Sequence, residues 1–265
     1  MAQPPDLLHL AAAGGATGTP IVFVHGAFGA PWMWSRNFMP WFAERGHDTY
    51  ALRLRGTGPI SSGAVEPGLA DYLEDLEAAV HQMGGPPVVV AHSLGALVAQ
   101  MALGRIPMRA LALLAPVPPT GMFWSSMRLA LHAPSLWART VLSATEAGFA
   151  TTQATRETLF TDDASEELVR EVHVNLCPQP VRPLLEAQWP RYVPRAHRLQ
   201  VPLLTLAAEH DRLIPVDAVE RTARHHGAHH VTVGGTGHAM MLDASWAESA
   251  LAIAHWLDAH AREAA

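Results

Sequence analysis

Short apolar runs alternate with amphipathic segments along most of the chain. An unbroken apolar run is typical of a strand covered on both faces, as in a parallel sheet, and apolar residues spaced three and four apart indicate a helix. The alternation therefore predicts an α/β fold, with a mostly parallel central sheet and helices on both faces. The expected strands are residues 21–24, 49–52, 88–91, 110–114, 203–207 and 230–233, and the expected helices include 69–83, 94–103 and 244–260.

One part of the chain interrupts this alternation. Residues 116–200 contain helical patterns and many prolines but no clear strand, and they carry large apolar side chains such as Trp124 and Trp137. Because small-molecule pockets are mostly apolar, we expect a helical lid whose inner face covers a substrate pocket. A surface insertion that packs on itself is the alternative. The predicted division is a core of residues 1–115 and 201–265, with the lid at 116–200.

Composition narrows the classes of function. The 265 residues suffice for one substantial domain, with or without an inserted subdomain. All 18 basic residues are arginine and they are scattered, and the net charge is −6, so we expect no nucleic-acid partner. We interpret residues 1–19 as neither a signal peptide nor an anchor, and no apolar stretch is long enough for a membrane span. The single cysteine, Cys177, suits a reducing compartment, and we expect a cytoplasmic protein.

The strongest chemical signal is the segment from Val88 to Val98, in which an apolar strand runs into Ser93 and then into a helical pattern. This is typical of a nucleophile elbow, where the serine occupies a strained turn with its hydroxyl above the sheet. The flanking Ala91 and Gly95 are small, as the close approach of strand and helix requires, although glycine is commoner at the first position. A serine that only caps a helix is the alternative, and it needs no small flanks. The same helix start makes the Leu94 N–H a candidate oxyanion donor.

A second donor is expected in the loop after the strand at residues 21–24, which reads His25-Gly26-Ala27-Phe28-Gly29. The loop after an early strand is the usual place for that donor. The Ala27 N–H is the first choice and the Phe28 N–H is the alternative. We expect His25 to hold the loop rather than to act as a base.

The remaining chemistry follows the last two expected strands. Asp211 comes shortly after the strand at 203–207 and is the first choice for an acid, with Glu209 in the same loop as its competitor. His238 follows the last strand in a glycine-rich loop that allows its imidazole to reach back over the sheet. A neutral imidazole there would take the proton of Ser93, while the acid orients the ring. The chain order serine, acid, histidine is the order found in the fold that carries nucleophile elbows.

The chain has 16 histidines, so a single one proves nothing. The pairs His225-His226 and His229-His230 suggest a metal site, but the pattern places them at a helix end and in the turn before the last strand, facing solvent. We therefore expect no metal and no cofactor.

These residues together resemble the α/β-hydrolase superfamily over essentially the whole chain. Residues 23–28, followed by Trp32 and Trp34, and residues 51–58 are similar to the lysophospholipase-like and the plant methylesterase and hydroxynitrile-lyase branches. Thr57 departs from them, because their common form has a histidine between the glycines. The resemblance implies a sheet of up to eight strands, a lid after the sixth, and catalysis without a cofactor. The first two strands of such a sheet are poorly marked here, which leaves a shortened sheet open.

The expected activity is hydrolysis of carboxylic esters, because Ser93 can form an acyl-enzyme that water activated by His238 then cleaves. Serine rather than aspartate at this position argues against the dehalogenase and epoxide hydrolase chemistry of relatives. Carbon–carbon bond hydrolysis, lactone hydrolysis and a lyase reaction are alternatives for the same triad, and a non-catalytic ligand-binding protein is the contrasting class. We expect a small-molecule ester-type substrate of apolar character, bound near Phe28, Trp124 and Met240, and leave a homodimer open.

Overall fold

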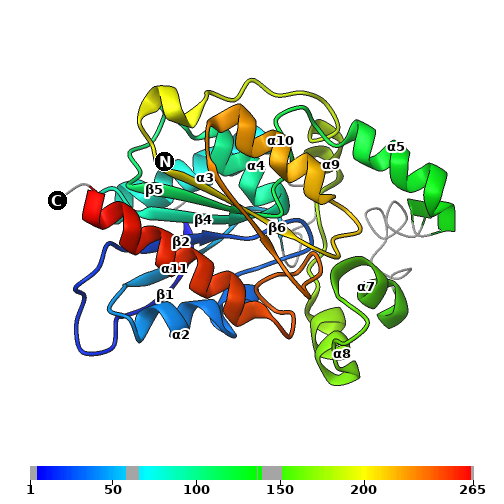
Figure 1. Ribbon diagram of the computed structural model, residues 1–265, viewed down its shortest axis with the longest axis horizontal. Coiled ribbons are helices and arrows are strands. Elements are labelled where there is room, and N and C mark those ends of the chain that lie inside the picture. Colours follow the sequence, from blue (N-terminus) through cyan, green and yellow to red (C-terminus); the bar gives the residue numbers. More distant parts are fainter. Residues whose placement is uncertain (1–4, 58–65, 136, 139–150, 264–265) are drawn as a thin grey trace.

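A seven-stranded sheet forms the centre of the computed structural model, which describes residues 5–57, 66–135, 137–138 and 151–263 (Figure 1). The strand order is β1-β3-β2-β4-β5-β6-β7; β1 pairs antiparallel with β3, and every other pair is parallel. The expected α/β class and all six expected strands are confirmed. The strands are β1 (Asp6–Leu10), β2 (Ile21–Val24), β3 (Thr49–Arg53), β4 (Val88–His92), β5 (Ala110–Leu114), β6 (Leu203–Ala208) and β7 (His229–Val233).

Two apolar clusters lie on the two faces of the sheet. In β4, Val89 belongs to the cluster shared with α3, α4 and α10, and Val90 belongs to the cluster shared with α2 and α11. Both valines are completely buried, and each such burial contributes roughly 1.5–3 kcal/mol. This is why the inner strands appear as unbroken apolar runs. The helices are α1 (Trp32–Ser35), α2 (Phe38–Ala43), α3 (Leu69–Gln82), α4 (Ser93–Met101), α10 (Val216–His226) and α11 (Trp246–Glu263).

The segment between β5 and β6 contains helices, and no strand is found in its described residues, 116–135, 137–138 and 151–200. Figure 1 shows α5, α7 and α8 together at one end of the sheet. Residues 139–150 of the expected lid lie outside the described residues, and the division into core and lid stays a prediction. The elements are α5 (Phe123–His132), α7 (Thr152–Leu159), α8 (Glu166–Asn175), α9 (Val181–Glu186) and the 3₁₀ helix η2 (Ala196–Leu199).

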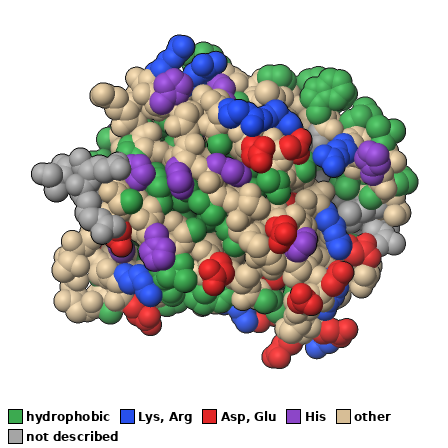
Figure 2. Space-filling model, viewed as in Figure 1, with side chains coloured by type: hydrophobic (Ala, Val, Ile, Leu, Met, Phe, Trp, Pro, Cys, Tyr) green, Lys and Arg blue, Asp and Glu red, His purple; other side chains and the backbone are tan. Residues whose placement is uncertain are grey.

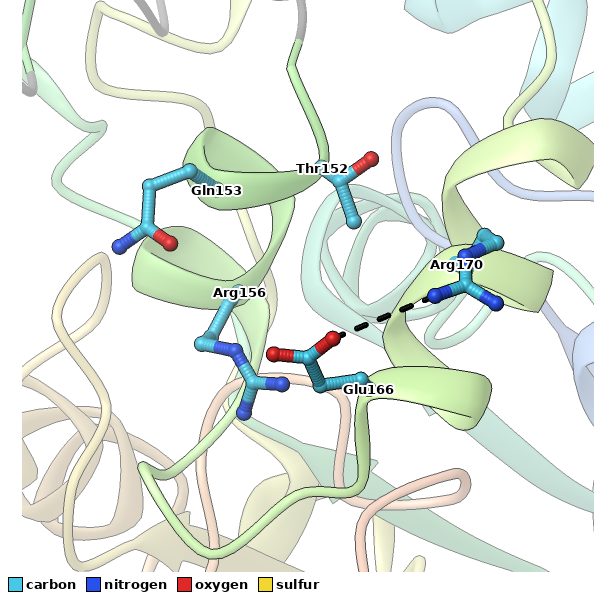
Figure 3. A pocket seen from close by; sticks show the side chains of 5 residues that line it. All are labelled: Thr152, Gln153, Arg156, Glu166 and Arg170. Carbon is cyan, nitrogen blue, oxygen red and sulfur yellow. Dashed lines mark ion pairs between the residues drawn. The ribbon is translucent and has the colours of Figure 1, made fainter.

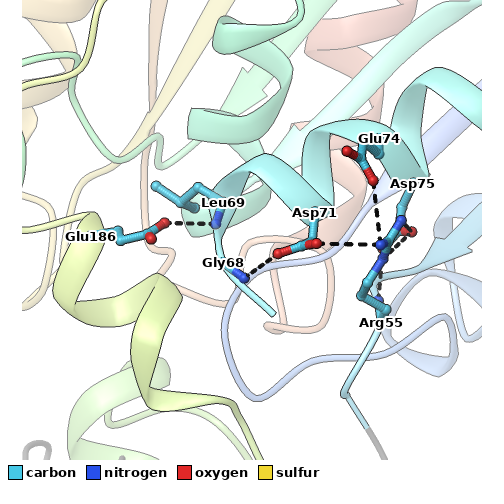
Figure 4. Close-up of polar contacts among 7 residues, drawn as sticks. All are labelled: Arg55, Gly68, Leu69, Asp71, Glu74, Asp75 and Glu186. Atoms are coloured by element: carbon cyan, nitrogen blue, oxygen red, sulfur yellow. Dashed lines mark hydrogen bonds and ion pairs between the residues drawn. The ribbon is translucent and has the colours of Figure 1, made fainter. Parts of the chain in front are cut away.

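Two carboxylates join α9 of this segment to α3 of the sheet layer. Glu186 on α9 accepts the N–H of Leu69, the first residue of α3, at 2.8 Å (Figure 4). In return, Glu66 accepts the N–H groups of Val181 and Arg182 in the first turn of α9. Each carboxylate meets a helix N-terminus, where free N–H groups and the helix dipole favour negative charge. The end of the inserted segment is therefore fixed to the core.

A buried histidine joins α10 to its neighbours. His226 is only 1% exposed, so the expectation that its side chain faces solvent is wrong. Its Nδ1 accepts the N–H of Ala196 at 3.3 Å, and its Nε2 donates to Oε1 of Gln100 at 3.1 Å. Burial, with smaller contributions from neighbouring histidines, lowers the pKa of His226 from 6.5 to about 3. The ring is needed in its neutral form for both contacts.

We expect His226 to make the protein less stable in mild acid. Unfolded His226 binds a proton below pH 6.5 and the folded one does not until about pH 3, so stability present above pH 6.5 is lost as the pH falls. Between pH 7 and 4.5 this loss is about 2–3 kcal/mol. Urea unfolding of the wild type and His226→Gln across this range should show a shallower pH dependence for the variant. His81→Gln, at an exposed histidine of α3, is the control. If the free energy of unfolding has the same pH dependence in all three proteins, His226 is not the source of the acid sensitivity.

Candidate active site

Ser93 lies at the tight turn between β4 and α4. Its φ is +51°, a left-handed conformation that non-glycine residues rarely adopt. The helix that follows passes very close to the loop after β2: a Cβ on Gly95 would lie 2.3 Å from the carbonyl oxygen of His25. Only glycine fits there, and the completely buried Ala91 is accommodated on the strand side. The turn thus has the geometry of a nucleophile elbow.

Three side chains, each just beyond the carboxyl end of a different strand, form one chain of hydrogen bonds. His238 Nε2 lies 3.0 Å from Ser93 Oγ, and His238 Nδ1 lies 2.8 Å from Asp211 Oδ2. The side chain of His238 is 4% exposed and that of Asp211 is completely buried. With a carboxylate at Nδ1, that nitrogen carries the proton, and the Nε2 lone pair faces the serine hydroxyl. This arrangement can activate a serine oxygen.

The structure distinguishes the two acids of the loop after β6. Oδ1 of Asp211 accepts the N–H groups of Leu213 and Ile214, at 2.8 and 2.9 Å, which leaves Oδ2 directed at the histidine. Glu209 instead has an exposed carboxylate that accepts the N–H of Gly235 at 2.9 Å. Asp211, not Glu209, is therefore the carboxylate on the His238 ring.

The groups that hold the histidine loop were not predicted from the sequence. Asp243 is completely buried and accepts the N–H of Gly237, the residue before His238, at 2.7 Å. The N–H of Ala239, on the other side of the histidine, donates to the carbonyl of Leu159 in α7 at 2.9 Å. The one signal in the sequence was an acid within the apolar segment that follows the histidine. Part of the inserted segment thus supports the position of His238.

His92, directly before Ser93, packs against His238. Its Nε2 donates to the carbonyl of His238 at 3.0 Å, and the two ring centroids are 4.7 Å apart. Burial lowers the pKa of His92 well below its ordinary value, with a smaller contribution from His238. A second positive charge is therefore kept away from the ring that receives the serine proton.

The loop after β2 is held by His25, as expected. Its Nδ1 donates to the carbonyl of Gly26 at 2.8 Å, and its Nε2 accepts the N–H of Leu54 at 3.2 Å. Burial is the main cause that lowers the pKa of His25 to about 4. Both ring nitrogens are occupied by the backbone, so His25 has no free nitrogen to serve as a base.

The three candidate oxyanion donors differ in their partners. The Phe28 N–H is already occupied, because it donates to Oε1 of Gln179 at 3.2 Å. The N–H groups of Ala27 and Leu94 have no hydrogen-bond partner within the described part of the chain. These two groups remain available for an incoming oxyanion.

The expected substrate-binding residues have very different surroundings. Phe28 is half-buried beside Ala27, whereas Met240, two residues after His238, is completely buried in the core. Trp124 on α5 is 74% exposed and packs edge-on against Phe123. Figure 2 shows apolar side chains gathered at the end of the molecule that α5 occupies. The role of these three residues in binding stays a prediction.

A separate cavity of about 280 Å³ lies between α7 and α8 (Figure 3). Its lining is polar and includes an ion pair of Arg170 with Glu166 at 4.0 Å, but none of the three hydrogen-bonded residues above.

Among the described residues, no group of three or more His, Cys, Asp or Glu side chains is placed to hold a metal ion. No helix in those ranges is long and apolar enough to cross a membrane.

Comparisons with known proteins place the chain in a family. A model of the alpha/beta hydrolase family matches residues 21–250, whereas comparison with curated proteins finds no match. The esterase EaEST from Exiguobacterium antarcticum superimposes with a TM-score of 0.74 at 14% identity, covering 96% of this chain and 95% of that one. A thermophilic esterase from Thermogutta terrifontis gives 0.69 at 18% identity, with 96% and 93% covered. MenH from S. aureus gives 0.71 at 18% identity, with 95% and 97% covered.

Likeness at such low identity shows a shared fold and no particular substrate. The resemblance to the lysophospholipase-like and plant methylesterase branches stays a prediction. The family match covers most of the sheet, both loops that carry Asp211 and His238, and the Ser93 turn. This chain belongs to the α/β-hydrolase family.

Proposed function

We propose that the protein is a cofactor-free serine hydrolase that cleaves carboxylic esters of small to medium apolar substrates. One observation carries the proposal: the uninterrupted hydrogen-bond chain from Ser93 through His238 to Asp211, at the tip of a strained turn. Such a chain supplies a nucleophile, a base and an orienting carboxylate together. The likeness to two esterases adds support without choosing a substrate.

Acylation begins when Ser93 Oγ attacks the ester carbonyl carbon while His238 Nε2 takes the hydroxyl proton. The carbonyl oxygen becomes an oxyanion that the N–H groups of Ala27 and Leu94 stabilise, helped by the N-terminus of α4. Asp211 stabilises the resulting imidazolium and keeps the proton on Nδ1. The carbon–oxygen bond to the alcohol then breaks, and His238 gives its Nε2 proton to the departing alkoxide.

Deacylation repeats these steps with water in place of serine. His238 Nε2 removes a proton from water as its oxygen attacks the acyl carbon. The bond to Ser93 Oγ breaks, the serine recovers its proton from His238, and the carboxylic acid leaves. Every proton that His238 accepts is returned within the cycle, so no cofactor is needed.

A series of 4-nitrophenyl esters from acetate to long acyl chains tests the proposal. We expect turnover with an optimum at a short or medium acyl chain, together with labelling of Ser93 by a fluorophosphonate. Turnover of a dienol diketone or a cyanohydrin without ester turnover would replace ester hydrolysis by carbon–carbon cleavage or a lyase reaction. A folded protein that neither turns over nor becomes labelled would be a non-catalytic binding protein.

A further inference from the structure

Phe28 has an unusual backbone conformation beside the expected oxyanion donor. Its φ is +59°, in the left-handed region, directly after Ala27. A non-glycine residue in this region is strained and persists only when its surroundings fix it. Both backbone groups of Phe28 are held from the inserted segment: the N–H by Gln179 Oε1 at 3.2 Å, and the carbonyl by the N–H of Cys177 at 2.9 Å.

Gln179 is itself fixed on its other side. Its side chain is buried, and its Nε2 donates to the phenol oxygen of Tyr72 at 2.9 Å. Tyr72 lies on α3 and is completely buried, so its phenol stays protonated and its position is set by the core. Two residues after Gln179, the N–H of Val181 donates to the Glu66 carboxylate, which is one of the two contacts that join α9 to α3. A continuous set of contacts therefore runs from α3 through Gln179 to the loop after β2.

We propose that Gln179 is a positioning residue for the oxyanion hole; this inference rests on the serine hydrolase function proposed above. The Gln179 amide fixes the peptide between Ala27 and Phe28, and through it the direction of the Ala27 N–H. The loop lies close to the nucleophile, since a Cβ on Gly26 would be 2.9 Å from Ser93 Cβ. Without the Gln179 acceptor, the Phe28 N–H loses its partner, and the left-handed conformation of Phe28 is held only through its carbonyl by the Cys177 N–H.

Gln179 occupies the Phe28 N–H and leaves that of Ala27 free, so the loop presents one donor in a fixed direction. An oxyanion donor acts on the charge that develops in the transition state, not on the bound ester. Loss of its orientation therefore lowers kcat and leaves KM nearly unchanged. A residue with only a general structural role in the segment would not produce this separation.

The test compares Gln179→Met, which keeps the length of the side chain but removes the amide, with Gln179 wild type on the best 4-nitrophenyl ester. We expect kcat to fall on the order of 10–100-fold. This fall should not exceed the fall in kcat that follows complete removal of one oxyanion donor, which is about 10²–10³-fold. Inhibition by a trifluoromethyl ketone, which forms an oxyanion adduct with Ser93, should weaken by a similar factor. Inhibition by the matching alcohol, which forms no adduct, should not change.

Two further variants make the result specific. Gln188→Met removes a half-buried glutamine of the same segment. Its amide oxygen accepts the hydroxyl of Ser126 and its Nε2 donates to the carbonyl of Leu184 in α9, and the substitution should leave all constants unchanged. Tyr72→Phe keeps Gln179 Oε1, which accepts the Phe28 N–H, but removes the phenol oxygen that accepts from Gln179 Nε2. It should therefore give a smaller loss in kcat than Gln179→Met. If Gln179→Met fails to fold, Tyr72→Phe carries the test with the same two inhibitors.

Unchanged kcat and ketone inhibition in the Gln179 and Tyr72 variants would overturn the proposal, and so would a KM that rises together with both inhibition constants. These outcomes differ from failure of the proposed function itself. A wild-type protein that shows no ester turnover and no fluorophosphonate labelling would reject the serine hydrolase, before any variant is compared.

Discussion

Ser93→Ala is expected to lower kcat/KM for 4-nitrophenyl esters by about 10⁴–10⁶-fold. Alanine removes the oxygen that His238 Nε2 meets at 3.0 Å and keeps the Cβ that packs in the turn. The acyl-enzyme then cannot form, and only the binding and oxyanion groups remain. Alanine is no worse than serine at a φ of +51°, so the fold should be retained.

The measurement combines steady-state kinetics, fluorophosphonate labelling and thermal unfolding of Ser93→Ala and the wild type. The label should appear on the peptide that contains Ser93 in the wild type and be absent in the variant. Ser35→Ala, at an exposed serine of α1, is the matched control and should behave as the wild type in all three measurements. Activity of Ser93→Ala within tenfold of the wild type would assign the nucleophile elsewhere.

The inner strands β2, β4, β5 and β6 could be predicted from the sequence because they are buried on both faces. Val89 and Val90 face opposite layers, which produces the unbroken apolar run of β4. The edge strand β1 was not predicted, because four of its five side chains are exposed and no apolar face marks it. Its pairing with β3 is made by backbone hydrogen bonds and by two cross-strand side-chain pairs, His9 with Tyr50 and Asp6 with Arg53. These partners lie far apart in the sequence, so no local pattern predicts the pairing.

In the site too, local patterns predict residues that follow strands but not contacts between residues far apart in the sequence. Ser93, Asp211 and His238 each follow a strand expected from the sequence, namely β4, β6 and β7. Parallel strands bring their carboxyl ends to one edge of the sheet, so the three residues could be placed together from the sequence. The support from Gln179 to Phe28 joins residues 151 positions apart through a side chain in a helical insertion. No local pattern encodes such a contact. The choice between Asp211 and Glu209 likewise depends on loop conformation, which only the structure gives.

Asp211→Asn should reduce kcat by about 10⁴-fold, with little change in KM. The Asn Oδ1 can still accept the N–H groups of Leu213 and Ile214, so the loop should keep its shape. Its Nδ2, however, donates a hydrogen where Asp211 Oδ2 accepts one, and so favours the His238 tautomer with its proton on Nε2. That tautomer directs a proton, rather than a lone pair, at Ser93 Oγ.

Glu209→Gln is the matched control, because it makes the same change of acid to amide two residues away in the same loop. The Glu209 side chain is 52% exposed and bonds a backbone N–H that an amide oxygen can also accept, so kcat should change by less than about threefold. A large loss in Glu209→Gln with a mild one in Asp211→Asn would reverse the assignment of the acid. Equal, small losses would show that His238 needs no carboxylate, a result that its 2.8 Å contact with a completely buried oxygen argues against. Because the two variants carry the same net charge, any difference between them reports which carboxylate contacts the ring rather than the electrostatics of the whole chain.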